Sequence, residues 1–150
     1  MTNHSSFAYS STLFSLSGQL IDSQLQLTFN LKTSFVDTRS LPGTVPLLEK
    51  TLPSIFDNQC INPQNLSFKE EVKATEIGHL FEHILLEYLC DEQISQGSTS
   101  ADFSGETSWD WPNNSYGCFN IAINTNLCSL EIINPALTRT ISLTEALLRS

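Results

Sequence analysis

The chain has 150 residues, which fits one domain large enough to bury a hydrophobic core without disulfide or metal staples. Apolar residues make up 40% and charged residues 15%, a globular composition that excludes a largely disordered chain. Sixteen acidic against seven basic residues give a formal net charge of -9, which disfavours nucleic acid and anionic membranes as partners. An acidic surface favours a cationic or arginine-bearing partner, although net charge by itself usually reflects solubility.

The cysteines and the N-terminus indicate a compartment. No two of the four cysteines form a Cys-x-x-Cys pair, so reduced structural thiols are expected rather than a thiolate zinc or redox site. The first residues lack a basic region followed by an apolar run, and no stretch approaches 18 apolar residues. We therefore expect a cytoplasmic protein without a signal peptide or membrane span.

The first two expected strands cover residues 7–16 and 25–31, which are rich in β-branched and aromatic residues. In the second of them, apolar and polar residues alternate as in a strand with one buried face. A turn near Ser17 and Gly18 would join the two as an antiparallel pair.

Two helices are expected next. Thr44 can cap a short first helix, and Pro53 ends it. Residues 54–67 have neither a helical nor a strand period and predict a loop, after which a second helix covers about residues 74–94. Residues 95–115 then predict a long loop, which its two tryptophans should keep ordered.

The last part of the chain predicts a hairpin and a helix. Residues 117–124 and 127–133 resemble two strands joined by a tight turn. A capping-box pattern from Ser142 to Glu145 indicates that a final helix begins there. This order of elements predicts one α+β domain over residues 1–150, with helices packed on a mostly antiparallel sheet.

The second helix carries the pattern His79-x-x-Glu82-His83, which is typical of a metal site. At about 100° per residue, His79, His83 and Glu87 fall on one side, opposite the apolar residues that form the core face. Two imidazoles four residues apart can bind one cation, and zinc suits nitrogen ligands. Glu82 would be the base that takes a proton from metal-bound water. The alternative is a solvated polar face on an amphipathic helix.

The third metal ligand stays open at this point. Glu87 lies about 12 Å along the helix axis from His79, so it would either reach the metal by its side chain or orient His83. Glu106, in the tryptophan loop, is the other candidate.

The tryptophan loop is the candidate substrate-binding segment. Trp109 and Trp111 could stack on a guanidinium group, with Asp102, Glu106 or Asp110 pairing its charge. The alternative is that the aromatic residues simply anchor the loop over the core.

Several blocks share an order and spacing with a known family. They are Leu41-Pro42-Gly43, Thr51-Leu52-Pro53-Ser54, Cys60, Gly78-His79-Leu80-Phe81-Glu82-His83-Ile84-Leu85-Leu86-Glu87, Gly105-Glu106-Thr107 and Tyr116-Gly117-Cys118-Phe119-Asn120-Ile121. Over roughly residues 40–150 the chain thereby resembles the N-terminal domain of cyanophycin synthetases. In that family the domain precedes an ATP-dependent ligase domain and a Mur-ligase-like domain. It binds a polyaspartate polymer with arginine side groups, and in some members it cleaves the polymer to produce primers.

The resemblance implies a zinc-dependent hydrolase that cuts cyanophycin into shorter chains. It assigns zinc to His79 and His83 and activation of water to Glu82, and it adds Glu87 as a third metal ligand or its close support. Synthetase domains are a further implied partner. Since the sequence ends at Ser150 without a ligase domain, we expect an isolated domain or a stand-alone relative.

Two departures from the family leave rival functions open. Residues 62–65 replace an expected glycine pair, and residues 105–109 replace an arginine-containing loop. The first rival is a non-catalytic module that tethers the polymer for a synthetase. The second is a structural or assembly domain that binds neither metal nor polymer.

Overall fold

The computed structural model describes residues 4–57, 67–98, 103–113, 115–126 and 128–150. Its centre is a five-stranded antiparallel sheet with the spatial order β1-β2-β3-β5-β4. The strands are β1 (His4–Ser10), β2 (Phe14–Ile21), β3 (Gln24–Leu31), β4 (Ser104–Ser108) and β5 (Cys118–Asn124). The helices are α1 (Thr44–Thr51), α2 (Phe68–Glu71), α3 (Ile77–Ser95) and α4 (Leu130–Leu148), with short 3₁₀ helices at Thr38–Ser40, Pro53–Asp57 and Val72–Ala74.

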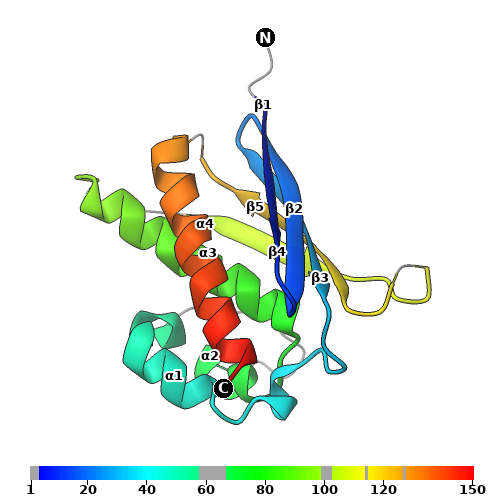
Figure 1. Ribbon diagram of the computed structural model, residues 1–150. Coiled ribbons are helices and arrows are strands. Elements are labelled where there is room, and N and C mark those ends of the chain that lie inside the picture. The colour runs from blue at the N-terminus through cyan, green and yellow to red at the C-terminus, as the bar shows by residue number, and fades with distance from the viewer. Residues whose placement is uncertain (1–3, 58–66, 99–102, 114, 127) are drawn as a thin grey trace.

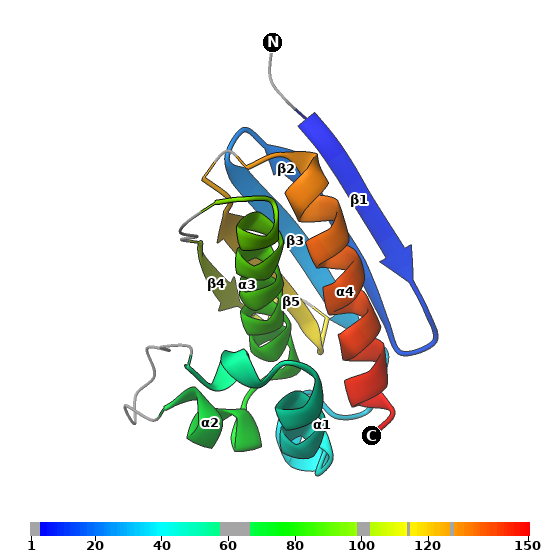
Figure 2. The same ribbon diagram turned by 90° about the vertical axis from the view of Figure 1, so that its left-hand side faces the viewer.

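The helices α3 and α4 lie side by side across one face of the sheet, and α1 and α2 lie near the start of α3 (Figures 1 and 2). The predicted α+β fold, with helices packed on an antiparallel sheet, is therefore confirmed. Within the described ranges, no helix combines the length and the apolar character that a membrane crossing requires.

Alternation along the central strands determines which face of the sheet is buried. In β3 the odd-numbered residues from Leu25 to Leu31 are buried, as predicted, and the residues between them are more exposed. Opposite them, β5 contributes Phe119, Ile121 and Ile123, which are also buried. One face thus meets the helices, and the other is left to small hydroxyl and amide side chains.

Helix α3 is the main element packed on this apolar face. Phe81 lies with its ring centroid 5.0 Å from Phe29 and 6.5 Å from Phe14, so aromatic contacts join the helix to β3 and β2. Full burial of each such side chain contributes about 1.5–3 kcal/mol. At the start of α3, Gly78 lies directly against the Phe119 ring, so the absence of a side chain there allows close approach to β5.

The predicted connection between the first strands is wrong. Residues 7–16 contain a turn, because the Ser11 hydroxyl accepts the N–H groups of Leu13 and Phe14 and thereby separates β1 from β2. Gly18 lies inside β2, where a Cβ would meet the carbonyl of Gln26 on β3. The glycine therefore marks close packing of two strands rather than a turn.

The start of α1, the bounds of α3 and the segment between these helices also differ in detail from the prediction. Gly43 occupies the N-cap position of α1, and the Thr44 hydroxyl instead donates to the carbonyl of Leu41 at 2.8 Å. Helix α3 begins three residues later than expected and ends at Ser95. Of the predicted loop over residues 54–67, only 54–57 and Ser67 are described, and residues 54–57 belong to a 3₁₀ helix.

Three predictions in the last third are wrong. The expected loop over residues 95–115 contains β4, an edge strand too polar for its pattern to be recognised. Of the expected second strand over residues 127–133, residues 130–133 instead form the start of α4, whose buried positions recur with helical spacing. The pattern from Ser142 to Glu145 lies within this helix, so it caps nothing.

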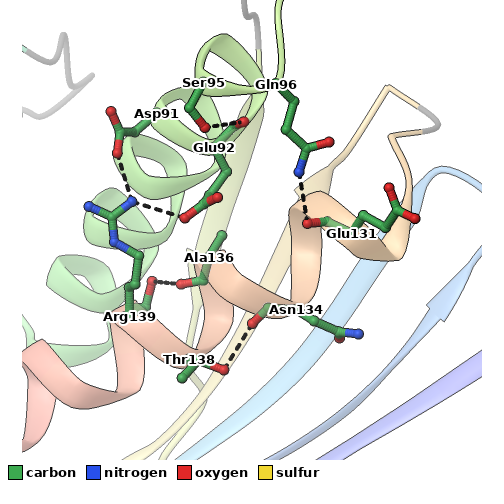
Figure 3. A network of polar contacts seen from close by, with 10 residues as sticks. Asp91, Glu92, Ser95, Gln96, Glu131, Asn134, Ala136, Thr138 and Arg139 are labelled. Atoms are coloured by element: carbon green, nitrogen blue, oxygen red, sulfur yellow. Dashed lines mark hydrogen bonds and ion pairs between the residues drawn. The ribbon is translucent and has the colours of Figure 1, made fainter.

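Pro135 lies inside α4 and has a specific compensation. Proline lacks the N–H that would bond to the carbonyl of Glu131, four residues earlier. The side-chain amide of Gln96, at the end of α3, donates to that carbonyl at 3.1 Å (Figure 3). A side chain from α3 thus supplies a donor that α4 cannot supply itself.

A second contact between these helices is made by Arg139. Its guanidinium donates to Asp91 at 2.6 Å and to Glu92 at 3.0 Å (Figure 3). It also lies 4.2 Å from the centroid of the Tyr88 ring. These contacts fix the relative position of α3 and α4 on their outer side.

Candidate metal site

Two histidines meet on the first half of α3. His79 and His83 are one turn apart, and their Nε2 atoms approach to 3.1 Å with the rings nearly perpendicular, at 86°. Two nitrogen ligands of a tetrahedral zinc ion with bonds of 2.0–2.1 Å would be about 3.3 Å apart. The observed distance fits both ligands of one ion, and equally a single N–H···N hydrogen bond between the rings.

The other nitrogen of His79 is held from the segment before the helix. The Thr75 hydroxyl lies 2.8 Å from Nδ1, and a carboxylate oxygen of Glu71 lies 3.8 Å from it. The backbone N–H of Thr75 donates to the Thr38 hydroxyl at 3.0 Å, which fixes the position of Thr75. Contacts of this kind at Nδ1 orient an imidazole and leave Nε2 directed at the candidate metal position.

His83 is buried, with an exposed fraction of 4%. The Phe68 ring of α2 stacks on its imidazole at 4.2 Å and 23°. Burial, followed by the nearby charge of His79, lowers the pKa of His83 to about 3. His83 is therefore neutral at pH 7, which is the protonation state that a metal ligand needs.

The expectation that the histidines face away from the core is therefore wrong for His83. The side of α3 opposite the sheet is covered by a second layer, in which Phe68 is fully buried. A helix packed on both sides has no broad solvated face, so the alternative of a solvated polar stripe does not apply to His83.

The low pKa of His83 predicts a loss of stability in acid. Unfolded His83 binds a proton near pH 6.5 and folded His83 only near pH 3, so between these values the unfolded state holds more protons. In the metal-free protein, we expect the free energy of unfolding to fall by up to about 1.4 kcal/mol per pH unit below pH 6.5 from this group. Urea denaturation at pH 7, 6, 5 and 4 measures it. The variant His83→Gln should show a flatter dependence, and an identical slope in both proteins would contradict the assignment.

Glu82 lies on the side of α3 that faces β4. Its carboxylate is 5% exposed and accepts a hydrogen bond of 2.7 Å from the Thr107 hydroxyl. Burial raises the pKa of Glu82; the hydrogen bond from Thr107 and the charge of His79 oppose this rise, and Glu106 adds to it. A carboxylate with a raised pKa is suited to accept and return a proton near neutral pH.

A glycine of β4 lies beside this carboxylate. A Cβ at Gly105 would be in van der Waals contact with Cγ of Glu82, at 3.4 Å, and would collide with the Ile123 side chain. Glu82 and Thr107 therefore meet because the edge strand approaches α3 closely. Thr107 faces the helix, and by the alternation of a strand Glu106 faces the opposite side of the sheet.

The two candidates for a third metal ligand, Glu87 and Glu106, have contacts away from the histidine pair. Glu87 lies one turn beyond His83 and accepts a hydrogen bond of 2.9 Å from the Ser54 hydroxyl. Glu106 lines a groove of about 480 Å³ on the open face of the sheet, with Gln26, Ser108 and neighbouring side chains. Among the described residues, no three histidine, cysteine, aspartate or glutamate side chains are grouped so as to hold a metal ion.

The tryptophans form an aromatic cluster with Phe119 and Tyr116. Trp109 and Trp111 both meet the Phe119 ring edge to face, at 5.6 and 5.5 Å, and the indole N–H of Trp111 donates to a backbone carbonyl at 2.9 Å. Trp109 is nevertheless 40% exposed and Tyr116 63% exposed. The cluster therefore anchors its segment to the sheet and still presents aromatic surface to a ligand.

The carboxylates predicted beside the tryptophans are separated from one another. Asp110 is exposed and accepts a hydrogen bond of 2.9 Å from the side chain of Asn113, whereas Glu106 lies in the groove of the open face. Asp102, Cys60 and residues 62–65 lie outside the described part of the chain.

Four site residues were missed from the sequence. They are Phe68, Glu71, Thr75 and Thr107. Only Thr75 had a usable signal, since it lies four residues before His79 at the start of the predicted helix. The others come from separate elements and are brought to α3 by the fold.

No protein-family model and no curated protein matches the chain. The fold itself therefore defines the class as a single α+β domain with a histidine pair and a buried glutamate on α3, one of its two sheet-packed helices of 19 residues. The resemblance to the N-terminal domain of cyanophycin synthetases stays a prediction from the sequence.

Proposed function

We propose that this protein is a zinc-dependent hydrolase in which His79 and His83 bind the metal. The observation that carries the proposal is the 3.1 Å separation of the two Nε2 atoms, with His83 neutral and His79 oriented through Nδ1. These two residues fit zinc, which when bound would polarise a carbonyl group and lower the pKa of water. Glu87 is the proposed supporting carboxylate, since it lies on the same helix.

Glu82 is the proposed proton-transfer residue. Its raised pKa and its burial suit a carboxylate that accepts a proton from the attacking water and later gives it to the leaving amine. The hydrogen bond from Thr107 restricts the carboxylate to one orientation. The position of Glu82 between the histidines in sequence and beside β4 in space makes it the one buried acid available for this role among the described residues of α3.

The proposed substrate is cyanophycin, or a related isopeptide polymer with arginine side groups. The net charge of -9 favours a cationic ligand, and exposed Trp109 together with Trp111, Asp110 and Glu106 could bind guanidinium groups. The sequence resemblance points to the same polymer and to synthetase domains as partners. A cytoplasmic location is part of this proposal.

Metal analysis of the purified protein tests the proposal. We expect about one zinc per chain by plasma mass spectrometry, and loss of most of it in His79→Ala and in His83→Ala. The matched control is His4→Ala, which removes the chain's remaining histidine and should leave the zinc content unchanged. A metal-free wild-type protein, or zinc that survives both site variants, would contradict the metal site.

A binding module without catalysis is the second candidate function. The groove of about 480 Å³ on the open sheet face favours it, because Glu106 supplies the one charged side chain among hydroxyl and amide groups such as Ser17, Gln26 and Asn120. We expect Glu106→Gln to weaken cyanophycin binding about three- to tenfold with zinc content unchanged. Glu131→Gln is the control, because Glu131 is an exposed acid at the start of α4, outside the groove, and its change should leave binding as in the wild type. A metal-free protein whose polymer binding depends on Glu106 would favour the module over the hydrolase.

A further inference from the structure

The strand β1 forms one edge of the sheet, and its own residues lack the features that usually block pairing. All seven residues of β1 pair with β2 in one continuous register, without a bulge. Residues 5–10 include no proline and no charged side chain, whereas the whole chain carries a net charge of -9. Edge strands are normally protected by charges, prolines or bulges, so this edge is suited to pairing.

The hydrogen-bond pattern shows which groups of β1 point outward. The N–H of Ser11 donates to the carbonyl of Phe14 at 2.9 Å, so these two form a hydrogen-bonded pair. Because such pairs alternate along an antiparallel ladder, the backbone groups of Ser6, Ala8 and Ser10 point away from β2. Three successive outward-facing positions are enough to pair with another strand.

A groove lies beside this edge, between β1 and α4. It measures about 320 Å³, and its lining is mixed: Phe7, Tyr9, Leu16, Leu137 and Ile141 are apolar or aromatic, and Ser6, Asn134 and Thr138 are polar. A strand added to β1 would direct alternate side chains into this groove.

We propose that the β1 edge pairs with the same edge of a second copy of this chain, so that two five-stranded sheets join into one. An antiparallel arrangement about a two-fold axis at Phe7 places Ser6 opposite Ala8 of the second copy and uses the full length of β1. Phe7 then faces Phe7 of the second copy in a non-hydrogen-bonded pair, where side chains approach most closely.

The charges around β1 are compatible with a second copy as the occupant. Residues 5–10 carry no charge, and the charged groups that reach this segment have partners: Lys32 donates to Ser10 and Ser11, and Glu145 accepts from Tyr9 and lies 3.1 Å from Arg149. Two acidic molecules can therefore meet along this strand without placing like charges against each other. The strand of the second copy also brings its own Phe7 and Tyr9 beside the groove, so that aromatic side chains meet its apolar lining residues.

Sedimentation equilibrium from about 1 µM to about 1 mM tests the proposal. We expect a reversible dimer for the wild type and a dissociation constant at least about tenfold higher for Ala8→Pro, which removes an outward N–H from each copy. Ala8→Val keeps that N–H and should dimerise as the wild type does. A wild type that is monomeric throughout, or Ala8→Pro dimers of undiminished affinity, would overturn the proposal.

Cross-linking tests the register independently, including the case in which Ala8→Pro fails to fold. Under mild oxidation, Phe7→Cys should form a disulfide between the introduced thiols of two copies, because position 7 faces itself. Ser5→Cys is the matched control, since position 5 faces position 9 of the second copy. Peptide mass spectrometry distinguishes these links from those of the natural cysteines. Equal cross-linking of both variants, or none of Phe7→Cys, would reject the register.

Discussion

The Glu82→Gln variant is expected to keep its fold and its metal but to hydrolyse cyanophycin about 10² to 10⁴ times more slowly. Glutamine has nearly the same shape and retains an oxygen that can accept the hydrogen bond from Thr107. Its amide cannot take up the proton that a carboxylate with a raised pKa can accept. The rate is measured from the appearance of shorter chains by gel electrophoresis, with zinc content and circular dichroism followed in parallel.

Glu87→Gln provides the matched comparison on the same helix. Glu87 is bonded to Ser54 and lies one turn beyond His83, so its change should reduce activity less than the change at Glu82. Full activity in Glu82→Gln would exclude Glu82 as the proton-transfer residue. Equal losses in both variants would indicate a general effect of helix charge instead.

Replacement of Gly78 by valine should lower the free energy of unfolding by about 3 kcal/mol. A Cβ at this position would lie 2.6 Å from Cδ1 and 2.7 Å from Cβ of Phe119, so α3 and β5 would have to separate. The gain in helix propensity on replacing glycine is below about 1 kcal/mol and cannot offset this overlap. Chemical denaturation monitored by circular dichroism measures the difference.

A double-mutant cycle with Phe119→Leu identifies the cause. The smaller side chain creates space, so the two changes together should cost at least about 1 kcal/mol less than the two separate costs added. Strict additivity would mean that the clash with Phe119 is not the origin of the loss. Because Gly78 precedes His79, zinc content of the single variant also reports how far the displacement reaches the site.

The elements that were predicted correctly have a regular spacing of apolar residues, and burial of those residues is its one cause. The alternation from Leu25 to Leu31 could only describe a strand with one buried face, and the buried positions of α3 recur at helical spacing. Both patterns reflect burial of apolar side chains against one layer. These two elements could be predicted from the sequence because no other interaction competes with burial in determining their structure.

The wrong predictions involve residues whose role depends on distant partners. The sequence predicts a turn at Gly18, but in the structure this glycine allows close approach of the Gln26 carbonyl on the neighbouring strand. The pattern at Ser142 occurs within a helix that had already begun at Leu130. Local sequence cannot distinguish these alternatives, since the deciding contact lies in another element.

The candidate site likewise has one part that the sequence predicts and another part that depends on the fold. The spacing of His79, Glu82 and His83 follows from helix geometry and needed no knowledge of the fold. Burial of His83 under Phe68, and the hydrogen bond from Thr107 to Glu82, arise only when other elements pack on α3. The sequence therefore predicted which residues meet on the helix, but not the environment that shifts the pKa values of Glu82 and His83.

The bond from Gln96 to the carbonyl of Glu131 couples the ends of two helices. Fraying of the last turn of α3 would leave that exposed carbonyl of α4 to water, because Pro135 has no N–H to offer. Loosening of the first turn of α4 would in turn release the end of α3. Helix α3, which carries the histidines in its first half, is thus held to α4 at its other end. This contact restrains rotation of α3 about its own axis and favours a constant distance between the candidate site and the sheet.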